Sequence, residues 1–555
     1  MSGLRTLPEA LADAARGDAG IAFQSGAGET SSSYREIRRQ SLQVARALTD
    51  AGLRPGDLVA LIVPDGEQFL TALFGASIAR LIPASLYPPA TTGDLPRYIE
   101  LTAGILNAAE ARAVVTSRAL APAFAEARAM CPHLALVLCR EDLDAPPDEP
   151  SGAPTLDDIA FVQFTSGSTS MPKGVTLTHA NLAANIDAFA GPSGVAVRPD
   201  DIAVSWLPLN HDMGLVGMAL GAIYIGRPCV LITPQTFVKR PVEWLRALTR
   251  HRGTVSFAPT FAYDLCVRRV KDLGGLDLSG WRIAGCGAEP IHPATLAAFA
   301  AKFSAVGFRD TTFLPCYGLA EHVLAATFPP RGRGLRIERV AADDLAARRV
   351  AVSPAVPDSP STSLVSCGSA LPGHRLIVAN DRGEALPERE VGEILLAGPS
   401  VMVGYYKQEA LTAEVFRDGW LRTGDLGYLS GGELFVCGRI KDLIIVHGRK
   451  YHPQDFEWAA DDVNGVRRGR VVAFGVETSG ADRVVLVVEP SGTVSADLLA
   501  EAIRKRIGDL FGVYVDEVAI VPSGTVGRTT SGKVQRAATR ERFVRGEWSV
   551  EGTRA

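Results

Sequence analysis

The stretch Thr165-Ser166-Gly167-Ser168-Thr169-Ser170-Met171-Pro172-Lys173-Gly174 directly follows an apolar run at 159–164, which we expect to form a strand. Its hydroxyl groups, small residues and exposed backbone N–H groups can cradle an anion, and the lysine adds a positive charge. The spacing differs from the G-x-x-x-x-G-K-[ST] pattern of a Walker A loop. On composition alone, an ordinary Ser/Thr-rich turn between a strand and the next element is the alternative.

Segments on both sides of this loop alternate between short apolar runs and stretches with helical spacing. Before it, 34–51 has the apolar spacing of a helix, and 58–63 and 113–116 are typical of strands. After it come five further strand-like runs with helical stretches between them, at 202–206, 229–232, 255–258, 281–286 and 312–315. Strands that alternate with helices predict parallel α/β layers.

After Pro329 the sequence changes character. Residues 336–350 are charged with a weak helical period, and 353–363 are rich in proline and serine. Strand-like pieces separated by glycine-rich turns then follow at 376–379, 393–396, 434–436 and 443–446. This pattern predicts an antiparallel barrel or sheet. A last unit from Lys441 mixes short strands with one good helix at 496–510.

Charge and composition exclude several classes of protein. The chain has 555 residues, with 57 Lys and Arg against 61 Asp and Glu, so it lacks the basic surplus of a nucleic-acid or anionic-membrane binder. Its eight cysteines are scattered without a CxxC pair, which predicts reduced thiols and no zinc site. No secretory signal is visible, and the longest apolar run, 213–226, predicts a buried helix and no transmembrane segment. We therefore expect a cytoplasmic protein.

Four further motifs could carry chemistry, although each alone also fits an ordinary turn or surface loop. Tyr-Gly-Leu-Ala-Glu at 317–321 places a ring that can stack on a base four residues before a carboxylate that can hold Mg²⁺. Thr-Gly-Asp-Leu-Gly at 423–427 offers a carboxylate that can accept hydrogen bonds from two ribose hydroxyls. The other two are Gly-Arg-Ile-Lys-Asp at 438–442 and Gly-Arg-Thr-Thr-Ser-Gly-Lys at 527–533.

In this order and spacing, the five motifs resemble those of the ANL superfamily of adenylate-forming enzymes, from about residue 30 to about residue 545. Within it, the chain is most similar to fatty acyl-AMP ligases. The stretches that carry this similarity are Leu-Pro-Leu-Asn-His-Asp-Met-Gly-Leu at 207–215, Ser-Phe-Ala-Pro-Thr-Phe-Ala-Tyr-Asp-Leu-Cys at 256–266, Gly-Ala-Glu-Pro at 287–290, Arg-Lys-Tyr-His-Pro-Gln-Asp at 449–455 and Leu-Tyr-Pro-Pro-Ala at 86–90. Acyl-CoA ligases usually carry a different version of the 449–455 stretch.

The resemblance implies an α/β protein with the ANL fold. A large N-terminal domain, 1–438, would combine two parallel α/β subdomains with a β-barrel-like subdomain, and a small mobile α+β domain, 439–555, would carry the catalytic lysine. The implied reaction is ATP- and Mg²⁺-dependent activation of a medium- or long-chain fatty acid to acyl-AMP with release of pyrophosphate. The acyl group would then pass to the phosphopantetheine thiol of an acyl carrier protein acting in trans, in polyketide, lipopeptide or lipid biosynthesis.

The resemblance also implies a role for each matching residue. Lys533, Glu321 and His211 would be catalytic, with Glu321 on the metal. The nucleotide would be held by Thr165, Ser166, Gly167, Ser168, Thr169, Lys173, Ala288, Glu289, Tyr317, Gly318, Asp425, Arg439 and Lys533. The acyl chain would contact His211, Asp212, Met213, Phe257 and Tyr263. By residue type alone, His211 could instead be a hydrogen-bonded core histidine, and the apolar acyl residues could be plain core.

Three positions depart from the family pattern: Ser170 replaces a second glycine, Thr260 replaces an asparagine, and Lys441 stands at the hinge. Residues 336–366 lie where the ligase family carries an insertion. We expect this excursion to be an ordered surface segment near the domain seam that limits the swing needed to build a CoA site. An acyl-CoA synthetase is the alternative function, and a non-catalytic acyl-adenylate-binding protein is the alternative from another class.

Overall fold

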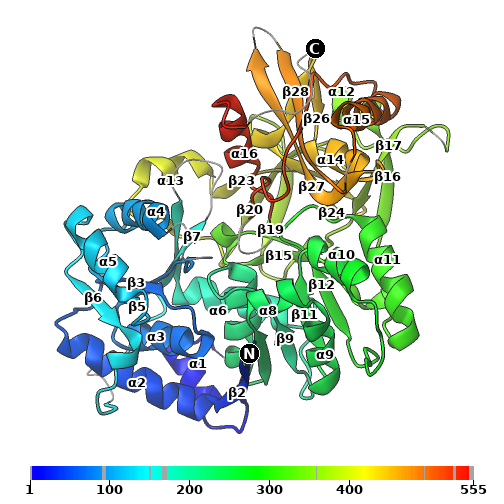
Figure 1. The fold of residues 1–555 in the computed structure, drawn as a ribbon. Coiled ribbons are helices and arrows are strands. Elements are labelled where there is room, and N and C mark those ends of the chain that lie inside the picture. Colours follow the sequence, from blue (N-terminus) through cyan, green and yellow to red (C-terminus); the bar gives the residue numbers. More distant parts are fainter. Residues whose placement is uncertain are drawn as a thin grey trace.

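The computed structural model describes residues 3–89, 95–148, 152–165, 172–357, 359–478, 481–492, 494–528 and 533–548. The predicted parallel α/β layers are two seven-stranded sheets, which lie next to each other in the lower part of Figure 1. The remaining strands form smaller sheets above them. None of the described helices is long and apolar enough to cross a membrane.

One sheet has the strand order β21-β8-β7-β4-β3-β5-β6. Its parallel strands are β3 (Leu58–Ile62), β4 (Ile82–Ser85), β5 (Ala113–Thr116), β6 (Leu136–Cys139) and β7 (Ile159–Thr165). Alternate residues of β3 pack against helices on opposite faces: Val59 and Leu61 share a core with α2 (Tyr34–Asp50) and α3 (Gly66–Ile78), and Ala60 packs with α4 (Leu95–Ala108) and α5 (Ala121–Ala127). Burial on both faces explains why these strands read as continuous apolar runs.

The second sheet has the order β13-β12-β11-β9-β10-β1-β2. Its strands are β9 (Ala203–Ser205), β10 (Cys229–Ile232), β11 (Val255–Ala258), β12 (Ile283–Cys286), β13 (Phe313–Pro315), β1 (Gly20–Ser25) and β2 (Gly28–Ser33). The five strands predicted between 202 and 315 are confirmed. The first two strands of the chain complete this sheet through the parallel β1–β10 pair, which no local pattern indicated.

The buried helix predicted at 213–226 is present in two parts. A π-helical segment covers Met213–Leu220, and α7 continues it over Gly221–Ile225. The left-handed backbone of Gly226 ends it. This helix lies between the second sheet and α6 (His179–Ala190), where it forms one wall of the cavity described below.

The predicted antiparallel barrel or sheet is a five-stranded antiparallel sheet, but the strand predicted at 443–446 is not part of it and pairs separately with residues 449–451. It consists of β19 (Arg375–Ala379), β20 (Gly392–Ala397), β22 (Phe416–Arg417), β23 (Trp420–Ser430) and β24 (Glu433–Arg439). Asp425 on β23 is directly opposite Arg439 on β24, so the pairing register brings two of the sequence motifs together.

The excursion at 336–366 is a hairpin of β16 (Ile337–Ala341) and β17 (Ser361–Val365) that encloses α12 (Ala342–Arg348). We expected a surface segment, but this part of the expectation is wrong, because Val340 and Ala351 are fully buried with Tyr428 and Phe435. The sequence pattern at 336–350 predicted a weak helix and missed strand β16, because the apolar side chains of this strand pack against strands that are distant in sequence.

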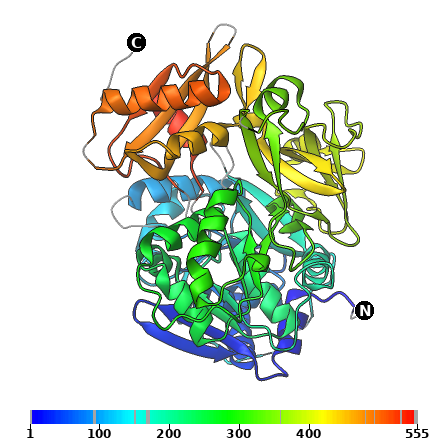
Figure 2. The ribbon, with the colours of Figure 1, turned by 90° about the vertical axis from the view of Figure 1, so that its right-hand side faces the viewer.

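The last unit has its own hydrophobic cluster and a sheet of β27 (Val466–Thr478), β28 (Ala481–Pro490) and β29 (Glu517–Ile520). Its helices are α14 (Pro453–Asp461), α15 (Ala496–Phe511) and α16 (Arg536–Val544). Two short strands precede them, β25 (Ile444–Val446) and β26 (Arg449–Tyr451). Figures 1 and 2 both show this unit above the two seven-stranded sheets.

Tyr263 on α10 (Thr260–Arg269) is the centre of an aromatic cluster under the second sheet. It is fully buried against Trp244, Trp281 and Phe299, and its hydroxyl donates to the backbone oxygen of Gly285 at 2.8 Å. A buried hydroxyl that donates to a backbone oxygen contributes to stability.

We predict that Tyr263→Phe lowers the free energy of unfolding by about 1–2 kcal/mol, because the carbonyl of Gly285 loses a buried donor. Urea unfolding measures the change. The matched control is Tyr514→Phe, whose side chain is 64% exposed and should give no measurable shift. Equal stability of Tyr263→Phe and the parent would contradict this account of the cluster.

Candidate active site

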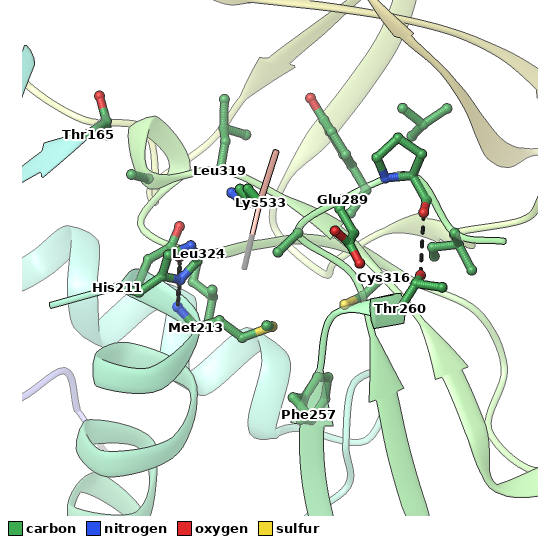
Figure 3. Close-up of a pocket in the computed structure, with 18 of the residues that line it drawn as sticks. Thr165, His211, Met213, Phe257, Thr260, Glu289, Cys316, Leu319, Leu324 and Lys533 are labelled. Carbon is green, nitrogen blue, oxygen red and sulfur yellow. Dashed lines mark hydrogen bonds and ion pairs between the residues drawn. The ribbon is translucent and has the colours of Figure 1, made fainter. Parts of the chain in front are cut away.

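A cavity of about 1850 Å³ opens between the two large sheets, the antiparallel sheet and the last unit. The structure brings many of the residues predicted from sequence to its walls: Thr165, Lys173, His211, Asp212, Met213, Phe257, Ala288, Glu289, Tyr317, Gly318, Glu321, Asp425, Arg439 and Lys533. Figure 3 shows side chains from several elements pointing into it. The predicted residues Ser166, Gly167, Ser168 and Thr169 lie outside the described part of the chain.

The parallel strands explain why these residues converge. β11, β12 and β13 run side by side in the same direction, so the segments after Ala258, Cys286 and Pro315 leave the sheet at one edge. Open α/β sheets bind ligands at this carboxyl edge. The hairpin of β7 and β8 (Lys173–Thr178) brings Thr165 opposite Lys173 at the corresponding edge of the first sheet.

Lys533 enters this cavity from the last unit. Burial lowers the pKa of its ammonium, while the carboxylates of Asp212 and Glu289 act in the opposite direction. Figure 3 shows Lys533 and His211 reaching the cavity from different parts of the fold. Little water surrounds this amine, and the nearby carboxylates favour its protonated form.

His211 and Asp212 form the wall next to this lysine. Nδ1 of His211 is 2.7 Å from Oδ1 of Asp212, which also accepts the backbone N–H of Met213 at 2.7 Å. Burial opposes ionisation of Asp212, but His211, Lys533 and this backbone donor outweigh it and lower the pKa to about 2. The carboxylate is therefore ionised throughout the physiological range.

Asp425 is held between two residues that the sequence had grouped with it. The hydroxyl of Tyr317 donates to its Oδ2 at 2.8 Å, and Nε of Arg439 donates to its Oδ1 at 3.0 Å. The nearby Asp425 carboxylate raises the pKa of Arg439, so the guanidinium stays charged. The three side chains form a rigid polar corner with a fixed acceptor.

Glu321 and Lys173 meet at a tyrosine that sequence reasoning missed. The hydroxyl of Tyr405 donates to Oε1 of Glu321 at 2.9 Å, and Nζ of Lys173 lies 4.9 Å from the centre of the same ring. Burial and the charge of Lys441 lower the pKa of Lys173. Tyr405 lies on β21 (Gly404–Tyr405), which pairs with β8, so only the sheet pairing revealed it.

The chain turns tightly between Gly318 and Leu324. A Cβ on Gly318 would lie 1.8 Å from the backbone oxygen of Leu324, so this position requires glycine. Val323 has φ +64°, an unusual conformation for a β-branched residue, and the N–H of Leu324 donates to the oxygen of His322 at 2.7 Å. The turn fixes where Glu321 and Leu324 face the cavity.

An apolar branch of the cavity runs along the helix that begins at Met213. Met213, Gly217, Gly221 and Ile225, four residues apart, line it. Glycine keeps it open, since a Cβ on Gly217 would lie 2.9 Å from the side chain of Leu324. This four-residue spacing was visible in the sequence, but residues of an ordinary hydrophobic core have the same spacing, so the sequence could not distinguish a cavity wall from core.

The expectation that Tyr263 lines this branch is wrong. Its side chain is in the aromatic core, as described above, because α10 directs it away from the cavity. On the same helix, Phe261, Asp264, Leu265 and Arg268 line the cavity, at the i, i+3, i+4, i+7 spacing of one helical face.

The sequence and fold of known proteins match this chain. The family model described as AMP-binding enzyme matches residues 11–406, which is more than half of the chain. The chain belongs to the AMP-binding enzyme family. The matched range contains the loop at 165–174 and the motif at 317–321, whereas Asp425, Arg439 and Lys533 lie beyond it.

Relatives of this AMP-binding enzyme cover nearly all of its length. It is 37% identical to “Putative acyl-CoA synthetase” of Caulobacter vibrioides (98% and 96% of the two chains) and 34% identical to “Medium-chain-fatty-acid--[acyl-carrier-protein] ligase JamA” of Moorena producens (94% and 92%). A solved structure from “Structural and Functional Studies of Fatty Acyl-Adenylate Ligases from E. coli and L. pneumophila” matches with TM-score 0.92, 37% identity and 98% of both chains.

We predict that Asp212→Asn lowers the free energy of unfolding at pH 7 by about 2 kcal/mol, because the folded-state pKa is about 2 against an ordinary value of 3.8. A depressed carboxylate pKa stabilises the fold above the unfolded value, and this contribution is lost as the pH falls from about 5 to about 2. Urea unfolding of both proteins across this range measures it. The matched control is the exposed Asp200→Asn, and a pH-independent difference for Asp212→Asn would contradict the prediction.

Proposed function

We propose that this enzyme activates a fatty acid with ATP to give acyl-AMP and pyrophosphate, and then transfers the acyl group to the phosphopantetheine thiol of an acyl carrier protein. The observation that carries the proposal is the convergence of Lys533, Asp425 and Glu321 on one cavity with an apolar branch. An ATP site and an acyl site must meet at one point for a carboxylate to attack the α-phosphate. The names of the carrier-protein ligase and fatty acyl-adenylate ligase relatives support the same reaction.

Adenylation brings two anions together, so positive charge and preorganised donors must offset their repulsion. The buried ammonium of Lys533 is assigned to the bond-forming centre, where it would bridge the acyl carboxylate and the α-phosphate. Thr165 and Lys173 would hold the outer phosphates, together with the predicted cradle at 166–169. The Asp425 carboxylate would accept hydrogen bonds from the ribose.

Three groups would frame the two ends of the acyl-AMP. Tyr317, with Ala288 and Glu289, would flank the adenine. His211 would close the carboxylate pocket next to Lys533, its ring held by Asp212. Met213 and Phe257 would contact the first part of the acyl chain in the apolar branch.

The carboxylate oxygens of Glu321 are chemically suited to bind Mg²⁺. It is a single carboxylate on the cavity wall, and Mg²⁺ is commonly held by one or two carboxylates together with substrate phosphates and waters. No cluster of three or more His, Cys, Asp or Glu that could hold a metal occurs among the described residues, which agrees with a metal that arrives with ATP. When bound, Mg²⁺ would neutralise phosphate charge.

The two half-reactions would use two orientations of the last unit. We assign residues 1–438 and 439–555 as the two domains, with the joint at Lys441. Lys533 faces the cavity in the orientation described, which suits adenylation. Rotation about the joint would withdraw it and let the acceptor thiol approach the acyl-AMP.

The excursion around α12 bears on which acceptor is used. Ala346 of α12 packs with Ile444 and Tyr451 in the core of the last unit, and Asp343 pairs with Arg449 at 2.9 Å. The ion pair is exposed and contributes little, so the apolar contact is the stronger restraint. We infer that this contact disfavours a CoA-competent orientation. Acyl-CoA synthesis is the second candidate function, favoured by the name of the Caulobacter relative.

We predict that Lys533→Ala forms acyl-AMP 10²–10³-fold more slowly than the parent while ATP binding is largely retained. Loss of one preorganised charge from the bond-forming centre costs about 2.7–4 kcal/mol. Fatty-acid-dependent pyrophosphate release measures the rate, and equilibrium binding of labelled ATP measures affinity. Acyl-AMP formation within threefold of the parent would show that the lysine has another role.

We predict that the parent loads a carrier protein and makes little acyl-CoA. Replacing residues 342–360 with an Asn-Gly turn should raise acyl-CoA output without raising adenylation, because Ala341 and Ser361 are paired and can be joined by a tight turn. Separation of acyl-AMP, acyl-CoA and acyl-carrier protein from one reaction measures all three products.

A point variant tests the same contact without removing core side chains. Ala346→Arg places a charge at a position that is 4% exposed, and should also raise acyl-CoA output. The control is Arg348→Ala at an exposed position of the same helix. Acyl-CoA synthesis by the parent as fast as adenylation would instead establish the second candidate.

A further inference from the structure

The loop that carries Lys533 is anchored at its base by an arginine. The described residues on either side of 529–532 are paired: Arg528 bridges to Val534, and the N–H of Gln535 donates to the oxygen of Gly527 at 3.0 Å. Arg536 follows three residues after the lysine and begins α16. Neither the sequence motifs nor the proposed mechanism gives this arginine a role.

Arg536 binds three separate elements of the last unit with an almost buried side chain. Its side chain is 19% exposed. Nε donates to the backbone oxygen of Ala473 on β27 at 3.1 Å, and Nη1 donates to Oδ2 of Asp442 at 3.0 Å. Nη2 donates to both carboxylate oxygens of Glu457 on α14, at 2.8 and 3.0 Å. A planar guanidinium is the side chain suited to such a fork.

The Glu457 carboxylate of this cluster is fixed by a further contact. Oε1 of Glu457 also accepts the N–H of Ala473 at 3.0 Å, so the same strand residue binds both partners of the pair. Asp442 is the residue directly after Lys441, which is the joint assigned above. Arg536 therefore connects the base of the lysine loop to the end of the joint.

We propose that Arg536 is a positioning residue for adenylation. It fixes the Lys533 loop to Asp442 and Glu457, so that rotation at the joint carries the lysine into the cavity together with the rest of the last unit. The proposal rests on the proposed function. Displacement of a reacting group by about 1 Å can cost on the order of 10²-fold in rate. Without this anchor, the lysine would remain on the loop but lose its fixed position.

The first experiment measures each half-reaction separately in Arg536→Met and Arg536→Lys. We expect acyl-AMP formation to fall 10–100-fold in kcat, with the KM values for ATP and fatty acid changing less than threefold. Transfer from supplied acyl-AMP to a carrier protein should stay within threefold of the parent. Arg536→Lys keeps the charge but loses the fork, so it should recover only part of the rate. The control is Arg540→Met, an exposed residue on the same helix.

A double-mutant cycle separates positioning from a general effect on folding. If Arg536 acts through Lys533, then Arg536→Met should lower the residual adenylation of Lys533→Ala by less than twofold. A full 10–100-fold further loss in that background would overturn the proposal, as would equal loss of both half-reactions. If Lys533→Ala itself keeps the parent's adenylation rate, the role of Lys533 in the proposed function is wrong, whatever Arg536 does. Failure of the proposed function is therefore distinguishable from failure of the Arg536 proposal.

Arg536→Met leaves two carboxylates without their partner and could lower stability, so a second variant is needed. Asp442→Ala removes the contact near the joint while Arg536 keeps Glu457, and Asp442 is 24% exposed. We expect a 5–30-fold loss of acyl-AMP formation, unchanged transfer and a thermal midpoint within about 3 °C of the parent. Unchanged adenylation in a folded Asp442→Ala protein would overturn the link to the joint.

Discussion

A buried lysine ammonium is the constraint on which the arrangement of this protein depends. Removing a charge from water is costly unless opposite charges surround it, and for Lys533 these are Asp212, Glu289 and Asp425. All three belong to residues 1–438, on a helix cap (Asp212), after β12 (Glu289) and on β23 (Asp425), whereas the lysine comes from the last unit. The compensation therefore exists only while the two parts of the chain face each other as described.

The contacts between the last unit and the rest of the chain reflect this dependence. Some of the contacts that hold the last unit in place are polar and exposed, such as the Asp343–Arg449 pair, or small and apolar, such as Ala346 on the core around Tyr451. Contacts of this kind fix an orientation without the large continuous core that holds the two seven-stranded sheets together. Such a junction suits the proposed function, in which the same acyl-AMP would face first the lysine and then a thiol.

The cavity illustrates a second constraint, which is the close approach of backbone segments. Gly217 and Gly318 occupy positions where a Cβ would meet Leu324, one at its side chain and the other at its carbonyl. The strained turn at Val323 sets the position of that leucine. The apolar branch and the Glu321 corner thus share one wall, so a change in this turn would affect the proposed acyl and phosphate sites together.

The alternation of strands and helices, the order of the motifs and hence the family could be predicted from the amino-acid sequence. Several polar residues that line the cavity, including Lys533 and Asp425, could also be identified, because they occupy short glycine-bounded motifs whose residue types indicate their chemistry. Strands such as Cys229–Ile232 and Val255–Ala258 were predictable because burial on both faces produces an unbroken apolar run.

Which side chains share a wall of the cavity depends on contacts between elements that are distant in sequence. Tyr263 and Phe261 are two residues apart on one helix, yet one is in the core and the other on the cavity, because the helix faces two different neighbours. Tyr405 reaches Glu321 through a strand pair, and β16 is part of a core formed with residues distant in sequence. Apolar periodicity shows that a face is buried but not what covers it, and that depends on partners the local sequence does not contain.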